Sequence, residues 1–388
     1  MSIKRLSGAH VPHYKNTASC APVRMPAPAK VTIPMGMHIG APCTPVVKVG
    51  DLVKVGQVIG EAAGFVSVPV HASVSGKVTA LTEIQVANGS FAKAVVIESD
   101  GEQAVSETVV PPVVETYEQF TAALRASGLV GLGGAGFPTT VKFSVKDPSK
   151  VEYLLINGAE CEPYITSDTR TMVDDADHIV KGAMTIRKFL GVKNIAIVIE
   201  DNKPEAIEIF RKKTADIEGF TVEAMPSLYP QGGEKVLIHN VTGRDVPEGK
   251  LPLDVGCIVI NCTSLAFISK YLETGMPLVE KCITVDGSAV ANPQNVIAPI
   301  GTALSDIFAF CGGYKAEPKK ILLGGPMMGI AVPDDSVPLL HDLRRRREKI
   351  HGRCAACGYY EICNGNFRAR AEAIDGDFWD SDPACYLT

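Results

Sequence analysis

The chain has 388 residues, of which 46% are hydrophobic and 21% charged, and its formal net charge is −5. This composition is typical of a soluble globular protein, and the length suits two or three domains. The negative charge gives no electrostatic reason to expect nucleic acid as a partner, and no apolar run reaches the about 18 residues of a membrane-spanning helix. The N-terminus, MSIKRLSGAHVPHYKNTAS, lacks the apolar segment of a secretory signal.

Residues 30 to about 97 contain short alternating runs such as VVKVGDLVKVGQVIGEA, separated by turn residues. This pattern predicts a small β-sandwich or barrel. VKVGDLVKVGQVIGEA followed by VHASVSGKV resembles the hammerhead fold of biotinyl and lipoyl carrier domains. A carrier places a lysine at the hairpin tip, whereas here the tip reads PVHAS from Pro69 to Ser73. We therefore expect a structural domain without a swinging arm.

From about residue 116 the pattern changes to buried strands that alternate with helices. The predicted strands are VEYLLIN (151–157), NIAIVIE (194–200) and GCIVIN (256–261). DADHIVKGAMTIRKFLG has helical apolar spacing and ends at Gly191, and NKPEAIEIFRKKTADI begins a second helix near Pro204. This alternation favours an α/β unit with a mostly parallel sheet. The stretch 280–315 returns to short strands and a helix, KKILLGGPMMGIAVP adds one strand and a glycine-rich turn, and HDLRRRREKI predicts a charged helical connector.

The stretch GLVGLGGAGFPTTVKF (128–143) contains five glycines within nine residues. Its G-x-G-x-x-G pattern does not have the context of a dinucleotide fold, because no helix of sufficient length follows before the next strand. Glycines nevertheless let backbone N–H groups converge on an anion, Pro138 suits the start of a helix, and Lys142 can add its charge. Phosphate binding and a tight structural turn are the two interpretations, and we favour phosphate.

Polar residues follow the predicted strands at their carboxyl ends, where open α/β sheets bind ligands. GAECEPYITSDTR follows the first strand, YPQGGEK opens the helix KVLIHNV, and NCTS ends the third strand. Carboxylates so placed can accept hydrogen bonds from ribityl or ribose hydroxyls. Together these segments predict a pocket for a phosphorylated polyol with a polar ring.

The series GLGGAGFPTTVKF, INGAECEPYITSDTR, YPQGGEK, INCTS and GGPMMGIAVP resembles the C subunit of the Rnf electron-transport complex and, more distantly, the flavin subunit of respiratory complex I. The resemblance covers roughly residues 30–337. It implies FMN as cofactor and NADH as substrate, stacked so that hydride passes between them. The cofactor-binding residues that we expect are Gly131, Gly133, Gly134, Gly136, Phe137, Lys142, Asn157, Glu160, Glu162, Tyr164, Gly233, Glu234, Asn261 and Ser264.

The last 35 residues contain Cys354, Cys357, Cys363 and Cys385, whereas the other seven cysteines are scattered. Four thiolates can bind an iron–sulfur cluster or zinc, and the single C-x2-C pair favours [4Fe–4S] over zinc. The two ferredoxin-type cysteine runs of the Rnf family are absent. The tail instead resembles the auxiliary-cluster segment of radical SAM enzymes that make heme d1, without their C-x3-C-x2-C core. The sequence leaves a natural fusion and a joined gene fragment as alternatives.

The expected fold is a multidomain α/β protein. The resemblance implies an N-terminal β barrel-sandwich hybrid (1–110), an α/β FMN/NADH-binding domain (111–278) and a small soluble-ligand-binding β-grasp element (279–337), and a charged connector with a Cys-rich, cluster-binding tail (338–388) is expected to follow. We expect a peripheral electron-transfer subunit on the cytoplasmic side of the cell membrane, with other Rnf subunits, NAD(H) and a ferredoxin-type carrier as partners. The rival hypotheses are a non-catalytic assembly module with a zinc-binding tail and a tetrapyrrole maturation protein.

Overall fold

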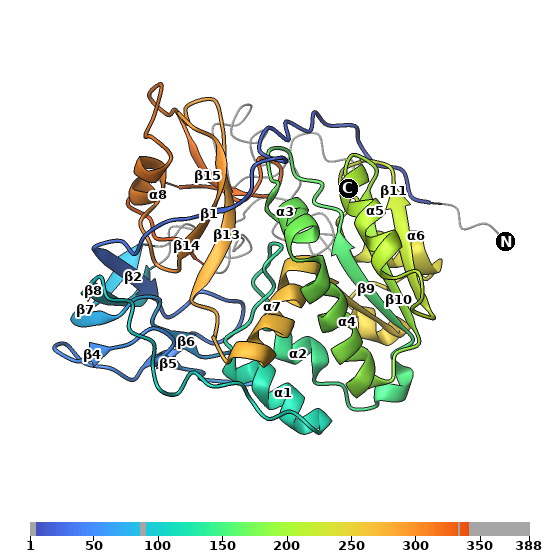
Figure 1. The fold of residues 1–388 in the computed structure, drawn as a ribbon, viewed down its shortest axis with the longest axis horizontal. Helices are drawn as coiled ribbons and strands as arrows, with labels where there is room; N and C mark the ends of the chain where they lie inside the picture. The colour runs from blue at the N-terminus through green and yellow to red at the C-terminus, as the bar shows by residue number, and fades with distance from the viewer. Residues whose placement is uncertain (1–4, 86–90, 333, 341–388) are drawn as a thin grey trace.

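The computed structural model describes residues 5–85, 91–332 and 334–340 (Figure 1). Three units lie side by side in this part of the chain: a small β unit, an α/β unit with a parallel sheet, and a second small unit of strands and one helix. The predicted charged connector and cysteine tail span residues 338–388, of which 341–388 lie outside the described residues.

The first unit consists of two antiparallel sheets. One has the order β2-β8-β7-β4 and the other the order β3-β5-β6. The strands are β2 (Lys30–Pro34), β3 (Thr44–Pro45), β4 (Leu52–Val53), β5 (Val58–Glu61), β6 (Val70–His71), β7 (Gly76–Gln85) and β8 (Phe91–Ser99). Alternate side chains point inward, so that Val31 and Ile33 of β2 are fully buried while Leu52 of β4 is exposed. The sandwich or barrel predicted from the alternating runs is therefore present.

The hairpin tip from Pro69 to Ser73 is buried against the rest of the molecule. His71 is 5% exposed and lies next to Gly128, and the Ser73 hydroxyl donates to the Ile300 carbonyl oxygen at 2.5 Å. A carrier domain needs this tip free to move. Here the tip joins the β unit to both other units, as expected for a structural domain.

The α/β unit has a four-stranded parallel sheet in the order β11-β10-β9-β12. Its strands are β9 (Tyr153–Gly158), β10 (Asn194–Glu200), β11 (Phe220–Met225) and β12 (Cys257–Asn261). Its helices are α1 (Tyr117–Ala126), α2 (Thr139–Phe143), α3 (Ser167–Asp174), α4 (Ala176–Leu190), α5 (Pro204–Lys213), α6 (Glu234–Thr242) and α7 (Cys262–Thr274), with 3-10 turns at Pro148–Lys150 and Pro252–Val255. Because all four strands are parallel, their carboxyl ends share one edge.

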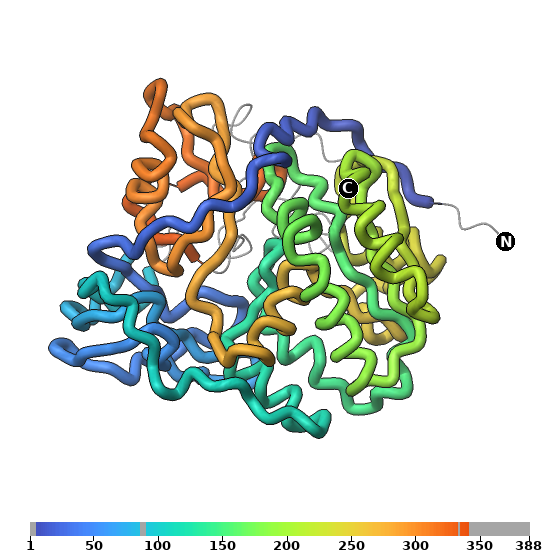
Figure 2. The backbone as a smooth tube through the Cα atoms, viewed as in Figure 1, coloured from blue at the N-terminus to red at the C-terminus, as the bar shows by residue number. Residues whose placement is uncertain are grey.

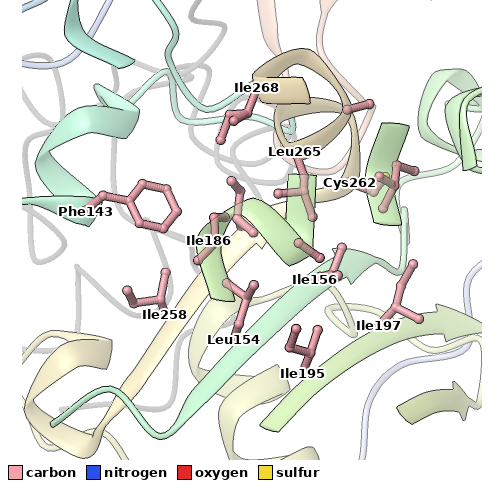
Figure 3. Packing of buried hydrophobic residues seen from close by; sticks show 14 of the residues in the cluster. Phe143, Leu154, Ile156, Ile186, Ile195, Ile197, Ile258, Cys262, Leu265 and Ile268 are labelled. Carbon is pink, nitrogen blue, oxygen red and sulfur yellow. The ribbon is translucent and has the colours of Figure 1, made fainter. Parts of the chain in front are cut away.

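Helices cover both faces of this sheet. Leu154 and Ile156 of β9 pack into the larger core with α1, α3, α4, α5 and α7, and Figure 3 shows this core between the sheet and the helices α4 and α7. Leu155 faces the opposite way into a cluster with α6. A parallel strand covered on both faces has few polar positions, which explains the continuous apolar runs in the sequence. The predicted helix end at Gly191 is confirmed, since this residue caps α4 with a φ of 66°.

The third unit has the sheet order β1-β14-β13, the helix α8 and the hairpin β15–β16. Its elements are β1 (Val23–Arg24), β13 (Glu280–Val285), β14 (Gln294–Pro299), α8 (Leu304–Phe310), β15 (Ile321–Leu323) and β16 (Ile330–Val332). KKILLGGPMMGIAVP forms two strands rather than the one that was predicted, because its glycine-rich turn folds the chain back. β1 comes from the N-terminal segment, which pairs with β14 in parallel.

The N-terminal segment, residues 5–22, crosses the α/β unit before the chain reaches β1. Figure 2 shows it in dark blue, running along the upper edge of the molecule from α5 and α6 towards β13 and β14. It forms a two-way backbone bridge between Ala9 and Tyr229, with both N···O distances at 2.8 Å. Within the described ranges, no helix combines the length and apolar character needed to cross a membrane.

Candidate functional site

A cavity of about 820 Å³ lies between the carboxyl edge of the parallel sheet and the third unit. The α/β unit contributes the glycine-rich loop, the ends of β9 and β12, and the turn before α6. The third unit contributes β13, α8 and the β15–β16 hairpin. Cofactor pockets commonly measure roughly 300–1,000 Å³. The cavity is therefore large enough for a nucleotide-sized ligand, and it lies at the sheet edge where the sequence predicted a pocket.

The glycine-rich loop forms a closed turn whose tip faces this cavity. The amide of Gly131 donates to the carbonyl of Phe137 at 2.9 Å, and Val130 bridges to Pro138, which precedes α2. Gly133 and Gly134 line the cavity. The loop thus brings two glycine backbones to the ligand space, as phosphate binding requires.

Asn261 connects the glycine-rich loop to α3 and α7. Its Oδ1 accepts the amide of Ser264 at 3.1 Å and caps α7, while its Nδ2 donates to Asp168 Oδ2 at 2.7 Å. The Ser264 hydroxyl in turn accepts the amide of Leu132 at 2.9 Å, and Thr263 donates to Asp168 Oδ1 at 2.6 Å. The conformation of the loop is therefore tied to Asp168 at the start of α3.

The acidic loop, residues 159–166, joins β9 to α3. Glu160 Oε1 accepts the amide of Asp168 at 2.7 Å, and Oε2 accepts the hydroxyl of Thr169 at 2.5 Å. Its side chain is only 2% exposed. Burial raises the pKa of Glu160 to about 7, against the ammonium of Lys15, which lowers it. Glu160 lines the cavity but also holds the first turn of α3, where a carboxylate is favoured by the helix dipole.

Glu162 links the acidic loop to the third unit. Its Oε2 accepts the amide of Met327 at 3.0 Å. A Cβ atom on Gly325 would lie 2.1 Å from the same oxygen, so only glycine fits beside this carboxylate. The GGPMMG turn between β15 and β16 therefore serves to receive Glu162, and this contact closes one side of the cavity.

Lys142 does not occupy the place that was expected for it. Its ammonium donates to Glu234 Oε1 at 2.8 Å and to the Val259 carbonyl at 3.0 Å, and Glu234 rather than Lys142 lines the cavity. Two other lysines, Lys235 of α6 and Lys281 of β13, line it directly. The ammonium of Lys235 donates to the Pro247 carbonyl at 3.3 Å, and sequence reasoning singled out neither lysine.

The structure brings most of the predicted cofactor-binding residues to one place. Those that line the cavity are Gly133, Gly134, Asn157, Glu160, Glu162, Gly233, Glu234 and Asn261. The other six do not line the cavity but contact residues beside it. Gly131, Gly136 and Phe137 form the turn of the glycine-rich loop, and Lys142 donates to Glu234. Ser264 accepts from Leu132, and Tyr164 stacks on Tyr14 of the N-terminal segment. Asn157 donates to the Gly232 carbonyl at 2.9 Å, which joins β9 to the turn before α6.

Sequence reasoning missed two residues that hold the site together. Asp168 follows the acidic loop within the quoted SDTR, and a carboxylate in the first turn of a helix was the available signal. Lys15 donates to three backbone carbonyls of the acidic loop from a distance of 145 to 150 residues along the chain. No local pattern in the sequence could have paired it with that loop.

The cysteines of the described residues do not form a metal site. In the ranges 5–85, 91–332 and 334–340, no group of three or more His, Cys, Asp or Glu side chains is arranged to hold a metal ion. Cys43, Cys257, Cys262 and Cys311 are buried, and the other three are half-buried. Burial raises the pKa of the Cys161 thiol, which lines the cavity, to about 11. These cysteines therefore act mainly as small apolar side chains. Cys354, Cys357, Cys363 and Cys385 lie outside the described residues.

Family models match most of the described chain. The model described as the RnfC barrel sandwich hybrid domain matches residues 4–102, the Nuo51 FMN-binding domain matches 124–270, and the SLBB domain matches 282–331. Together with the observed strands and helices, these matches confirm the predicted barrel-sandwich hybrid, the α/β flavin-binding domain and the small β-grasp domain.

Curated relatives extend over the same part of the chain. The C subunit of the Na⁺-translocating ferredoxin:NAD⁺ oxidoreductase complex of Acetobacterium woodii is 43% identical over 339 residues, which is 86% of this chain and 76% of the relative. The C subunit of the proton-translocating ferredoxin:NAD⁺ oxidoreductase complex of Clostridium ljungdahlii is 40% identical over 369 residues, with coverage of 90% and 80%. Among solved structures, an NAD⁺-reducing [NiFe]-hydrogenase in the air-oxidized state aligns with a TM-score of 0.47 and 21% identity over 60% of this chain and 47% of that one.

Proposed function

The chain belongs to the family of C subunits of ion-translocating ferredoxin:NAD⁺ oxidoreductase complexes, and we propose that it passes electrons between NAD(H) and iron–sulfur carriers through bound FMN. The observation that supports this most directly is the cavity at the carboxyl edge of the parallel sheet. It opens onto the glycine-rich loop inside the segment that matches the FMN-binding domain. The chain is accordingly an oxidoreductase subunit.

Different residues of the cavity lining suit the phosphate, the ribityl chain and the ring of FMN. Gly133 and Gly134 offer backbone for a phosphate, and Lys281 and Lys235 are the lysines among the residues that line the cavity. Asn157, Asn261 and Glu234 supply amide and carboxylate groups for ribityl hydroxyls and ring edges. The size of the cavity, about 820 Å³, leaves space for a nicotinamide beside a flavin.

Bound flavin supplies the conversion between the two-electron chemistry of NAD(H) and the one-electron chemistry of iron–sulfur carriers. The residues of this chain supply position and exclude water. The network of Leu132, Ser264, Asn261 and Asp168 fixes the glycine-rich loop relative to α3 and α7. The Glu162–Met327 contact holds the third unit over the cavity, which shields the ligand space from one side.

The visible spectrum of the purified protein tests this function. After incubation with FMN and removal of the excess, the protein should show flavin absorbance bands that bleach anaerobically when NADH is added. A colourless protein that contains zinc would support the assembly-module hypothesis instead. Deletion of residues 120–270 should abolish all NADH oxidation, whereas a tetrapyrrole maturation activity would survive it.

The cysteine tail is the proposed exit for single electrons. We assign Cys354, Cys357, Cys363 and Cys385 to one [4Fe–4S] cluster, in keeping with the resemblance of this segment to an auxiliary-cluster domain of heme d1 radical SAM enzymes. Anaerobic reconstitution should give about four iron and four sulfide ions per chain. Replacing Cys354 and Cys357 by serine should remove both, while zinc in stoichiometric amount with no sulfide would overturn the assignment.

The relatives are named as subunits of ion-translocating complexes. We propose that this chain likewise assembles with other Rnf-type subunits at the cytoplasmic side of the cell membrane, where it meets NAD(H) and a ferredoxin-type carrier. Co-purification with the membrane fraction that carries the complex, lost in a strain without the membrane subunits, is the expected result. Recovery in the soluble fraction of both strains would contradict it.

A further inference from the structure

The N-terminal segment holds the acidic loop along most of its length. The carbonyl of His13 accepts the amide of Tyr164 at 2.9 Å, and the ring of Tyr14 stacks on the ring of Tyr164 with centroids 4.9 Å apart. The hydroxyl groups of Thr17 and Thr166 are 2.6 Å apart and fully buried. Residues 13–17 therefore contact the acidic loop, whose residues Glu160, Glu162 and Ile165 line the cavity.

Lys15 is the centre of this contact. Its ammonium donates to the carbonyl oxygens of Glu160, Glu162 and Ile165 at 2.8, 2.9 and 2.5 Å. An ammonium group has three N–H donors, so the three carbonyls account for all of them. The side chain is 14% exposed and lies 3.9 Å from Glu160 Oε2. The arrangement is that of a cation within a cage of backbone carbonyls, with the cation tethered to the chain.

The caged carbonyls belong to a loop with an unusual backbone. Glu160 and Tyr164 have φ angles of 50° and 68°, in the left-handed region that non-glycine residues seldom adopt. Such a conformation persists only where the surroundings impose it. Glu160, Glu162 and Ile165, whose carbonyls Lys15 binds, all line the cavity. The position of the cavity wall is thus set from the N-terminal segment.

A second lysine beside the acidic loop, Lys203, has different partners. The ammonium of Lys203 donates to the Ala159 carbonyl at 2.6 Å and to Glu200 Oε2 at 3.0 Å, and it is 3% exposed. Lys203 thus has its own carboxylate partner, whereas the nearest carboxylate to Lys15 is that of Glu160, which is also engaged with α3. Without Lys15, the carbonyls of the loop would converge on one another with no donor between them.

We propose that Lys15 is a positioning residue of the cofactor site, whose tethered ammonium draws three carbonyls of the acidic loop together and so fixes one wall of the flavin cavity. This inference rests on the proposed function and adds to it a residue from outside the α/β unit. It assigns the N-terminal segment a part in cofactor binding. No contact between Lys15 and the flavin is required.

Flavin titration of the apoprotein tests the proposal. Lys15→Met keeps most of the apolar stem but removes the donors, and it should raise the Kd for FMN by about tenfold or more. Lys48→Met, at an exposed lysine of the barrel domain, is the matched control and should change the Kd by less than about twofold. An unchanged Kd in Lys15→Met would overturn the proposal.

Chemical rescue tests whether the N–H donors and charge of Lys15, and not only the bulk of its side chain, support FMN binding. Lys15→Ala leaves space for the lost propyl-ammonium, so added propylammonium should restore FMN binding to within about threefold of wild type. Tetramethylammonium at the same ionic strength has no N–H donor and should not. Equal effects of the two salts, or no rescue by propylammonium, would overturn the charge-specific role. If Lys15→Met does not fold, Lys15→Ala purified in propylammonium and exchanged into tetramethylammonium provides the same comparison.

Failure of this inference can be told apart from failure of the proposed function. If wild-type protein binds no FMN, the proposed function fails, and hydrogen exchange then tests Lys15 alone. Backbone amides of residues 160–166 should exchange about tenfold faster in Lys15→Met than in wild type, with those of α4 unchanged. Identical exchange in both proteins would overturn the tethering itself.

Discussion

Gly133 lies so close to Asn261 that a Cβ atom at position 133 would be 2.5 Å from Asn261 Nδ2 and 2.8 Å from its Cγ. Asn261 cannot easily move aside, because it caps α7 and donates to Asp168. A glycine at this position is therefore required by the neighbouring side chain, not only by the turn. The contact between Gly133 and Asn261 also joins the glycine-rich loop, the candidate phosphate-binding segment, to the end of β12.

Gly133→Ala should accordingly weaken FMN binding and stability together. The added methyl group displaces Asn261, and the loss of its cap on α7 costs about 1 kcal/mol. We expect the Kd for FMN, measured by quenching of flavin fluorescence, to rise about tenfold or more. Gly64→Ala is the control, since a Cβ there meets only Ala41 at an ordinary 3.4 Å. A Gly133→Ala protein with wild-type affinity would contradict the close-approach argument.

Asp168→Asn tests the network behind the loop. The oxygen of the side-chain amide introduced at this position can still accept from Asn261, but the Thr263 hydroxyl must then accept instead of donate, and both hydrogen bonds lose their charge assistance, which costs about 1 kcal/mol or more. The thermal midpoint should fall and the Kd for FMN should rise. Asp216→Asn, at an exposed aspartate, should change neither. Equal behaviour of the two variants would show that Asp168 does not support the site.

Gly325→Ala should separate the third unit from the acidic loop. A methyl group at 325 would lie 2.1 Å from Glu162 Oε2 and 2.6 Å from its Cβ, so the turn that donates the Met327 amide must shift. We expect faster hydrogen exchange in β15 and β16 and earlier proteolysis between residues 313 and 320, with the barrel domain unchanged. Retention of wild-type exchange in the hairpin would contradict this role of Glu162.

His71 should make stability depend on pH. Burial lowers its pKa from 6.5 to about 4, against a backbone hydrogen bond with Ala126 that raises it. The folded state therefore favours the neutral ring, and its stabilising contribution is complete above pH 6.5 and is lost as the pH falls towards 4. Between pH 7.5 and 5 the loss is about 2 kcal/mol.

The measurement is the urea midpoint at pH 7.5 and at pH 5 in wild type and His71→Gln. The variant lacks the titrating ring, so the difference between its two midpoints should be smaller than in wild type by the equivalent of about 2 kcal/mol. His10→Gln, at an exposed histidine, should retain the wild-type difference. Parallel pH profiles in wild type and His71→Gln would exclude His71 as the cause.

The sequence predicted the α/β unit well because buried parallel strands give continuous apolar runs. NIAIVIE coincides with β10 (Asn194–Glu200), and the strand ends led directly to Asn157 and Asn261. The hairpin β15–β16 was predicted as a single strand, because both of its strands are only three residues long and a glycine-rich turn separates them. Short strands carry too few positions for periodicity to separate them from loops.

Contacts between distant segments could not be predicted. Gly325 was recognised only as part of a glycine-rich turn, and nothing local indicated that it meets the carboxylate of Glu162. Lys142 was assigned to phosphate because it follows the glycines, yet the side chain points to Glu234 and Val259. In each case the partner is chosen by packing between units, which a pattern along one segment does not record.

The central claim is that the backbone around Gly133 and Gly134 receives the phosphate of the flavin. The most direct test compares the affinities of wild-type apoprotein for FMN and riboflavin, two ligands that differ only in that phosphate. We predict that FMN binds about a hundredfold more tightly or better, and that Gly133→Ala reduces this ratio. Equal affinities of the wild-type protein for FMN and riboflavin would contradict the account.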